Sequence, residues 1–210
     1  DNNGEISFPG NRIWDREVNV TECFGEYFSC KIILENNVKA FSEAEMIYSS
    51  GREEDNILFV KWGPGVGSSL IIHNNIYDNR RYGFSEMGHF LIGENMDITL
   101  ESEVSTHAIV KSVRKIFSME ENTAELFKVC KGDIENISAH NFIEWSVCND
   151  KILQKILDEK IMLMVKSTYN SMTLVPIDLV IYYGEIFEIE YIEKKYKTKL
   201  EDLLNDIGSD

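Results

Sequence analysis

The chain has few basic residues for its length. Its 210 residues include 21 Lys and Arg against 36 Asp and Glu, so the formal net charge is −15. A protein that binds nucleic acid through bulk charge neutralises phosphates with clustered Lys and Arg, and an acidic surface repels DNA and anionic lipid. The composition therefore excludes a nucleic-acid binder of that kind among these residues.

Cysteines and long apolar runs are scarce as well. The four cysteines, Cys23, Cys30, Cys130 and Cys148, are too scattered for a disulfide scaffold and form no C-x-x-C pair. No apolar run approaches the roughly 20 residues that cross a bilayer, and Asp1–Glu5 lacks the basic and apolar regions of a signal peptide. We expect buried or idle thiols in a soluble, cytoplasmic protein without a membrane partner.

The apolar content is nevertheless high enough for a core. Hydrophobic residues make up 43% of the chain and aromatic residues 11%, which argues against intrinsic disorder. The length fits one large domain or two small ones.

The first half of the chain predicts a strand, a helix and then a β-meander. Lys31–Leu34 is a short buried-strand candidate that runs into the helix-favouring stretch Val38–Tyr48. Two β-rich runs, Asn56–Trp62 and Ser69–His73, flank a glycine turn. Asn74-Asn75 then predicts a tight hairpin turn, because Asn tolerates the left-handed conformation.

The second half predicts helices and one strand. We expect helices over about 101–117, 123–147 and 150–172, a strand over 177–183, and a charged helix that reaches Asp206. The third helix has apolar residues and methionines at helical spacing, so it should pack on a sheet, with methionine as core filler.

The glycine turn, Gly63–Gly67, is the first candidate for chemistry. Gly63, Gly65 and Gly67 follow a strand, where backbone N–H groups can approach a phosphate closely. A glycine turn inside a β-hairpin has the same sequence, so the motif alone leaves both interpretations open.

Two polar groups are further candidates. Glu86 and His89 can hydrogen-bond a polyol, bind a metal, do acid–base work, or satisfy each other at a strand end. Glu35, Asn36 and Asn37 precede a predicted helix, where carboxamides cap the helix or bind the hydroxyls of a ligand.

Taken together and in order, these stretches resemble the ROK family of sugar kinases and sugar-responsive repressors. Six blocks of the family's consensus have counterparts here: Asn11-Arg-Ile-Trp14, Glu35-Asn-Asn-Val-Lys39, Gly63-Pro-Gly-Val-Gly-Ser-Ser69, Ser85-Glu-Met-Gly-His89, Leu100-Glu101 and Leu179-Val-Ile-Tyr-Tyr-Gly184. Six blocks in the family's order are far more specific than any one of them, and they span nearly all of the chain.

The resemblance implies an α/β fold of the actin-like ATPase (ribonuclease H-like) class. Residues 1–210 would form the large C-terminal, ligand-binding lobe, with residues 1–50 as an irregular leading segment and a strand-to-helix hinge region. The family's N-terminal lobe, and the helix-turn-helix domain of its repressors, would lie outside this sequence. The protein would then be a homodimer that contacts DNA only through that absent domain.

The resemblance also implies a sugar site. A hexose would contact Asn36, Asn37, Glu86, His89 and Glu101, which match the family's sugar-binding positions. Asn37 stands where family kinases have the Asp that acts as general base on the 6-hydroxyl of the sugar. An amide takes no proton at neutral pH, so no catalytic residue is expected there and binding should occur without phosphorylation.

The positions that hold cofactors in the family differ here. Pro64 replaces the Thr of the phosphate turn and removes a hydroxyl and an N–H, and Tyr183 and Glu185 would disfavour a nucleotide through bulk and charge. No cysteine lies between His89 and Leu100, where the family has its zinc thiolates, so the loop over 93–99 must be held by packing or be mobile. We expect neither ATP nor zinc.

The leading hypothesis is a sugar-sensing and dimerisation domain of a ROK-type transcriptional regulator. It would bind a hexose or N-acetylhexosamine without phosphorylating it, and the ligand would act by shifting populations. One alternative is an ATP-dependent, glucokinase-like sugar kinase that uses Glu35 or Glu86 as its base. The other is a degenerate scaffold that binds no sugar.

Overall fold

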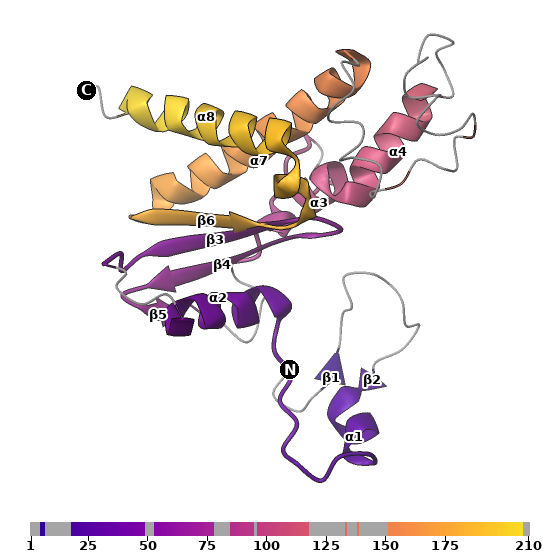
Figure 1. Ribbon diagram of the computed structural model, residues 1–210, viewed down its shortest axis with the longest axis vertical. Helices are drawn as coiled ribbons and strands as arrows, with labels where there is room; N and C mark the ends of the chain where they lie inside the picture. Colours follow the sequence, from indigo (N-terminus) through magenta and orange to yellow (C-terminus); the bar gives the residue numbers. More distant parts are fainter. Residues whose placement is uncertain are drawn as a thin grey trace.

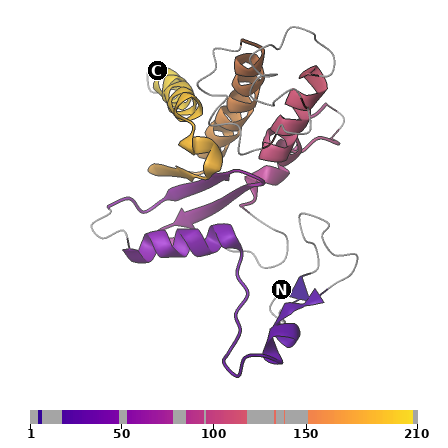
Figure 2. The same ribbon diagram turned by 45° about the vertical axis from the view of Figure 1, so that its right-hand side comes forward.

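The structure, a computed structural model, describes residues 5–6, 18–48, 53–77, 85–94, 96–117, 133, 138 and 151–207. Outside these ranges lie Asn11–Trp14, Cys130, Cys148 and, apart from residues 133 and 138, the helix predicted over 123–147. Among the described residues, a central sheet has helices on both of its faces (Figure 1), and Figure 2 shows the same layering from a second direction.

The central sheet has four strands in the order β5-β4-β3-β6. The strands are β3 Ile57–Trp62, β4 Val66–Ile72, β5 Asn75–Ile76 and β6 Leu179–Tyr183. β3, β4 and β5 form an antiparallel meander, and β6 runs parallel to β3 with Tyr182 beside Val60. The predicted meander and late strand are confirmed. The tight turn lies one residue earlier than predicted, at His73 and Asn74, whose φ angles are 49° and 57°.

The main core lies between this sheet and two long helices, α7 Lys151–Leu174 and α8 Glu190–Ile207. The inward residues of β3 are Leu58, Val60 and Trp62, as the two-residue period of a strand requires. Met164 of α7 is fully buried, which confirms methionine as core filler. In the described part of the chain, no helix combines the length and the apolar character needed to span a membrane.

The opposite face of the sheet carries α2, Asn37–Tyr48, the helix that the sequence predicted. Phe59 points to this side and contacts Tyr183 at 4.9 Å between ring centroids. Tyr183 in turn contacts Phe41 of α2 at 4.8 Å. Val38 and Ser42, one turn apart on α2, are buried against the sheet side of the helix. The start of α2 is thus fixed near the ends of β4 and β6.

The prediction of a single helix over 101–117 is wrong. Two helices stand there, α3 Leu100–Val104 and α4 Thr106–Phe117. Ser105 separates them with ψ 154°, an extended value. Backbone groups at the break bond outside the helices: Trp62 Nε1 donates to the Val104 carbonyl at 2.6 Å, and Thr106 N donates to the Gly63 carbonyl at 2.8 Å. These tertiary bonds replace the intrahelical bonds of a continuous helix.

The prediction of a strand at Lys31–Leu34 is also wrong. These residues lie without regular structure in the connection between α1 (Val20–Gly25) and α2, and Ile33 is 72% exposed. No described strand runs alongside them, and an apolar run without a partner has no ladder to join. The one further described sheet pairs β1 (Glu5–Ile6) with β2 (Val18–Asn19).

Gly184, which follows β6, provides a test of this packing. Its φ is 121°, and a Cβ there would stand 2.1 Å from the Trp62 carbonyl oxygen. Gly184→Ala is expected to lower the free energy of unfolding by about 3 kcal/mol or more, because backbone strain and overlap both oppose the native turn. Urea unfolding followed by tryptophan fluorescence measures the change.

The control is Gly25→Ala, because a Cβ at Gly25 meets nothing within 4 Å. This substitution should change the free energy of unfolding by less than about 0.5 kcal/mol. Equal unfolding midpoints for the two variants would contradict the assigned turn.

Candidate functional site

Asn36 caps α2 and also reaches across to Glu86. Its Oδ1 accepts hydrogen bonds from Val38 N at 2.8 Å and Lys39 N at 3.3 Å, which satisfies two donors at the start of the helix. Its Nδ2 donates to Glu86 Oε1 at 3.0 Å. Asn36 can therefore cap the helix and also bind a ligand, because the cap fixes the direction in which its amide nitrogen points.

Glu86 precedes a short 3-10 helix, η1 (Met87–His89), and Ser68 of β4 holds this segment in place. Ser68 Oγ accepts a hydrogen bond from Met87 N at 2.8 Å and donates to the Ser85 carbonyl. Glu86 is half-buried and His89 is exposed. The pair therefore lies at the surface of the fold, with the carboxylate on the inner side.

Burial raises the pKa of the Glu86 carboxyl above its ordinary value of 4.5, and the nearby charge of Glu101 adds to the rise. The charges of His89 and Lys39 and the hydrogen bond from Asn36 oppose it without reversing it. The two carboxylates are thus close enough to affect each other's charge. A group that donates hydrogen bonds to both would relieve this unfavourable arrangement.

Glu101 comes to the same place from α3. Its Oε2 accepts a hydrogen bond from Val66 N at 2.9 Å. The backbones meet here at Gly88 of η1, where a Cβ would stand 2.2 Å from the Val66 carbonyl oxygen and 3.5 Å from Glu101 Cβ. Glycine at position 88 is therefore required for η1, the start of β4 and α3 to converge.

The structure therefore brings together four of the five residues that the sequence predicted as sugar contacts. Asn36, Glu86, His89 and Glu101 interact by hydrogen bonds or by charge. Asn37 is the first residue of α2 and its side chain is exposed next to this group. We call the first four residues the polar cluster. Its carboxylates, amide and imidazole suit the hydroxyl groups of a neutral polyol.

The glycine turn has the contacts of a β-hairpin. It connects the antiparallel strands β3 and β4, and Gly63 N donates to the Gly65 carbonyl at 3.0 Å. Pro64 has no N–H, and the N–H of Val66 is already bonded to Glu101. A phosphate site of this type needs free backbone N–H groups. Three of the turn's five residues cannot offer one.

A carboxylate also lies against the glycine turn. Glu185 Cγ is 3.6 Å from where a Cβ on Gly63 would stand, and Glu185 Oε1 accepts a hydrogen bond from Thr106 Oγ1 at 2.8 Å. Tyr183 lies on the α2 side of the sheet, and burial raises the pKa of its hydroxyl to about 12. A polyphosphate beside this turn would meet the negative charge of Glu185.

Backbone contacts join the two ends of the loop over 93–99, where the related zinc motif would lie. Ile92 N donates to the Ile98 carbonyl at 2.9 Å, and Leu91 forms an isolated antiparallel bridge with Thr99. Whether packing holds this loop or the loop is mobile stays a prediction. No group of three or more His, Cys, Asp or Glu side chains able to hold a metal ion occurs among the described residues. The absence of zinc stays a prediction.

Sequence reasoning missed the residues that support the site. Ser68 enters the sequence analysis only as part of the block Gly63–Ser69, although a hydroxyl directly after a glycine turn is a signal for such a bond. No sequence pattern indicated a role for Thr106, because its partners, Gly63 of the glycine turn and Glu185, lie far away along the chain.

Comparison with known proteins gives the chain's relatives. The sequence pattern of the ROK family matches residues 1–208. The chain is 31% identical over 96 residues to a xylose repressor of Bacillus subtilis (strain 168), covering 45% of this chain and 24% of that protein. It is 22% identical over 191 residues to a glucokinase of Thermotoga maritima, covering 88% of this chain and 60% of that protein.

The fold is similar to a crystal structure of a ROK family glucokinase from Streptomyces griseus in complex with glucose and AMPPNP. The TM-score is 0.80 at 19% identity, over 95% of this chain and 68% of that chain. This likeness confirms the predicted mixed α/β, sugar-kinase-like fold. The chain spans less than two thirds of the length of the two curated relatives, which are a repressor and a kinase, so the comparisons leave both functions open.

The double role of Asn36 can be separated by substitution. Asn36→Ala should lower the free energy of unfolding by about 1 kcal/mol, because the helix loses its cap. Asn36→Ser should recover most of this loss, since Ser caps a helix equally well, but it lacks the amide that reaches Glu86. Urea unfolding measures both. Asn37→Ala is the control, and a loss as large as that of Asn36→Ala would contradict the assigned cap.

The raised pKa of Glu86 predicts how stability depends on pH. The folded protein keeps this carboxyl protonated above its ordinary pKa of 4.5, so in that range it binds more protons than the unfolded chain. The free energy of unfolding therefore falls as the pH rises through the window from 4.5 to the folded pKa. Glu86→Gln removes the titrating group and should gain stability relative to the unsubstituted protein across this window.

Urea midpoints of both proteins at several pH values between about 4 and 7 test this expectation. Glu201→Gln, which removes an exposed carboxyl of α8, is the control. A stability difference between Glu86→Gln and the unsubstituted protein that stays constant with pH would refute the assigned burial of Glu86.

Proposed function

The chain belongs to the ROK family, and we propose that it is the sugar-sensing, dimer-forming part of a transcriptional regulator in that family. On this proposal it binds a hexose or an N-acetylhexosamine and does not phosphorylate it. Residues 1–210 supply the C-terminal, ligand-binding lobe. A separate domain of the intact protein contacts DNA, because a net charge of −15 opposes contact with phosphates.

The polar cluster is the observation that carries the proposal. Asn36 uses its Oδ1 for the helix cap and directs its Nδ2 to Glu86 Oε1, while Glu101 uses Oε2 for the Val66 amide. These bonds use one oxygen of each carboxylate, Glu86 Oε1 and Glu101 Oε2, and each carboxylate has a second oxygen that can accept. Sugar hydroxyls donate to carboxylates through short, charge-assisted bonds. The cluster thus offers oriented acceptors for a polyol.

Different residues support the part of the proposal in which the sugar is not phosphorylated. Asn37 cannot take the proton of a sugar hydroxyl at neutral pH, and losing a positioned base typically costs about 10² to 10⁴ in rate. The glycine turn already uses Val66 N for a protein carboxylate, and Glu185 brings a negative charge to its other side. These features support binding without ATP.

The proposed signal begins at Glu101. A ligand that donates to Glu101 shares this carboxylate with the Val66 amide, and only Ser105 separates α3 from α4 along the chain. Ligand binding would then favour one arrangement of this region over another and so one arrangement of protomers. The coupling energy available to such a ligand is typically about 1–3 kcal/mol.

A sugar kinase is the second candidate, and one observation favours it. The raised pKa of Glu86 is typical of a carboxylate tuned for acid–base work, since burial is how enzymes bring a carboxyl toward neutral pH. In that case Glu86, rather than the residue at position 37, would accept the proton. The similarity to the Thermotoga maritima glucokinase also supports this alternative.

Isothermal titration of the intact protein against hexoses and N-acetylhexosamines tests the proposal. We expect saturable binding of at least one of them, and Glu101→Gln should weaken it about 10- to 100-fold, because a hydrogen bond to a charged group is lost. Asp202→Asn, an exposed carboxylate of α8, is the matched control and should leave the affinity unchanged.

The same preparation is then given ATP, magnesium and each sugar, with ADP release as the readout. The regulator proposal expects no sugar-dependent ADP. Sugar-dependent ADP release that disappears in Glu86→Gln would instead establish the kinase. If no sugar of the titration panel binds, the remaining hypothesis is a scaffold domain that binds no sugar.

A further inference from the structure

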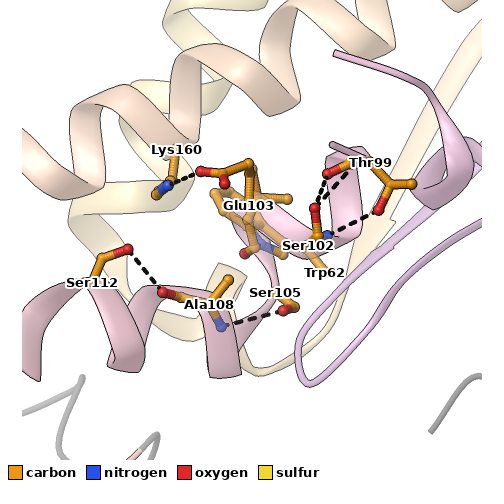
Figure 3. A network of polar contacts seen from close by, with 9 residues as sticks. Trp62, Thr99, Ser102, Glu103, Ser105, Ala108, Ser112 and Lys160 are labelled. Carbon is orange, nitrogen blue, oxygen red and sulfur yellow. Dashed lines mark hydrogen bonds and ion pairs between the residues drawn. The ribbon is translucent and has the colours of Figure 1, made fainter. Parts of the chain in front are cut away.

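We propose that the ion pair between Lys160 and Glu103 is a positioning device that holds α3 so that Glu101 faces the sugar. The inference deepens the proposed function, because it concerns the same site. Lys160 lies on α7, outside the polar cluster, and its Nζ lies 2.7 Å from Glu103 Oε2 (Figure 3).

The two carboxylates of α3 face different partners. Glu101 points to the glycine turn and accepts from Val66 N, whereas Glu103 points to α7 and accepts from Lys160. Residues two apart in a helix lie about 200° apart around its axis. Any rotation of α3 therefore moves both carboxylates together, and a bond that fixes one of them fixes the other.

α3 has only five residues, and a helix of this length has no stability of its own. Buried Leu100 and Val104 attach it to the core, Trp62 Nε1 bonds its last carbonyl, and a Thr99–Ser102 capping box closes its start. Figure 3 shows the Thr99–Ser102 capping box and the Lys160–Glu103 pair. Between the two ends of α3, the Glu103–Lys160 pair ties it to the long helix α7.

Lys160 is suited to this role because it is nearly buried. Its side chain is 10% exposed, and Glu103 is its ion-pair partner. A buried ammonium loses most of its hydration, so its geometry depends on that partner. The α8 pair Lys199–Asp202 has side chains that are 44% and 55% exposed, and exposed pairs of this kind constrain little. The two pairs differ in burial and not in chemistry.

Because the ion pair holds Glu101 in place, it should increase the affinity of the site for a sugar. A hydrogen bond weakens steeply when its angle departs from linearity, and Glu101 must satisfy Val66 N and a sugar hydroxyl at once. Without the ion pair, α3 can turn about its anchored ends, and the carboxylate then spends part of its time outside bonding geometry.

The test uses Lys160→Met, which removes the buried charge and leaves Glu103, 39% exposed, accessible to water. Lys160→Arg restores a cation, and Lys199→Met is the matched control. Each variant of the intact protein is measured by urea unfolding, by titration with the hexose that the unsubstituted protein binds best, and by the NMR shift and exchange rate of the Val66 amide. That amide reports the position of Glu101 whether or not a sugar binds.

We expect Lys160→Met to stay folded, to shift the Val66 amide and speed its exchange, and to weaken hexose binding by about 3- to 30-fold. Lys160→Arg should recover both properties, and Lys199→Met should change neither. The inference is overturned if Lys160→Met folds and keeps the Val66 amide shift, the amide exchange rate and the hexose affinity of the unsubstituted protein. The ion pair would then only stabilise the fold. If the unsubstituted protein binds no hexose, the proposed function fails, and the Val66 amide alone decides whether the pair positions Glu101.

Discussion

The hydrogen bond from the Val66 amide to the Glu101 carboxylate is the contact on which the site depends. It joins the first residue of β4 to α3, and it lies where the backbone of Gly88 passes against Val66. One bond therefore sets the position of a carboxylate of the polar cluster and removes a donor from the glycine turn. A turn whose amides are bonded within the protein has less to offer a phosphate, and this single contact links the polar cluster to the glycine turn.

Carboxylates of the protein surround the glycine turn on two sides. Glu101 accepts from Val66, and Glu185 lies beside Gly63 and accepts from Thr106. Negative charge here suits the rest of the chain, whose net charge is −15. It disfavours anions near the glycine turn and the polar cluster, which agrees with the neutral, hydroxyl-rich ligand that we propose. Burial is the main cause of the raised pKa of Glu86, and the nearby negative charge of Glu101 adds to it.

Much of the fold was predictable where local pattern and tertiary structure agree. The meander around the glycine turn, helix α2, the long apolar helix α7 and strand β6 all follow from periodicity and turn residues. Where the two disagree, prediction failed. The apolar run Lys31–Leu34 found no partner strand, and the helix expected over 101–117 is interrupted at Ser105 because Trp62 and Gly63 bond the backbone on either side of it.

By itself, the sequence determined the composition of the site and the family. The acidic charge, the order of the motifs and the amide at position 37 can all be read from single residues, because they depend on side-chain chemistry alone. Only the tertiary structure decided that Asn36 both caps a helix and bonds Glu86, that Glu101 bonds the glycine turn, and that Lys160 lies behind α3. Those partners are 50, 35 and 57 residues apart, and no local pattern encodes pairings that arise only when distant segments pack together.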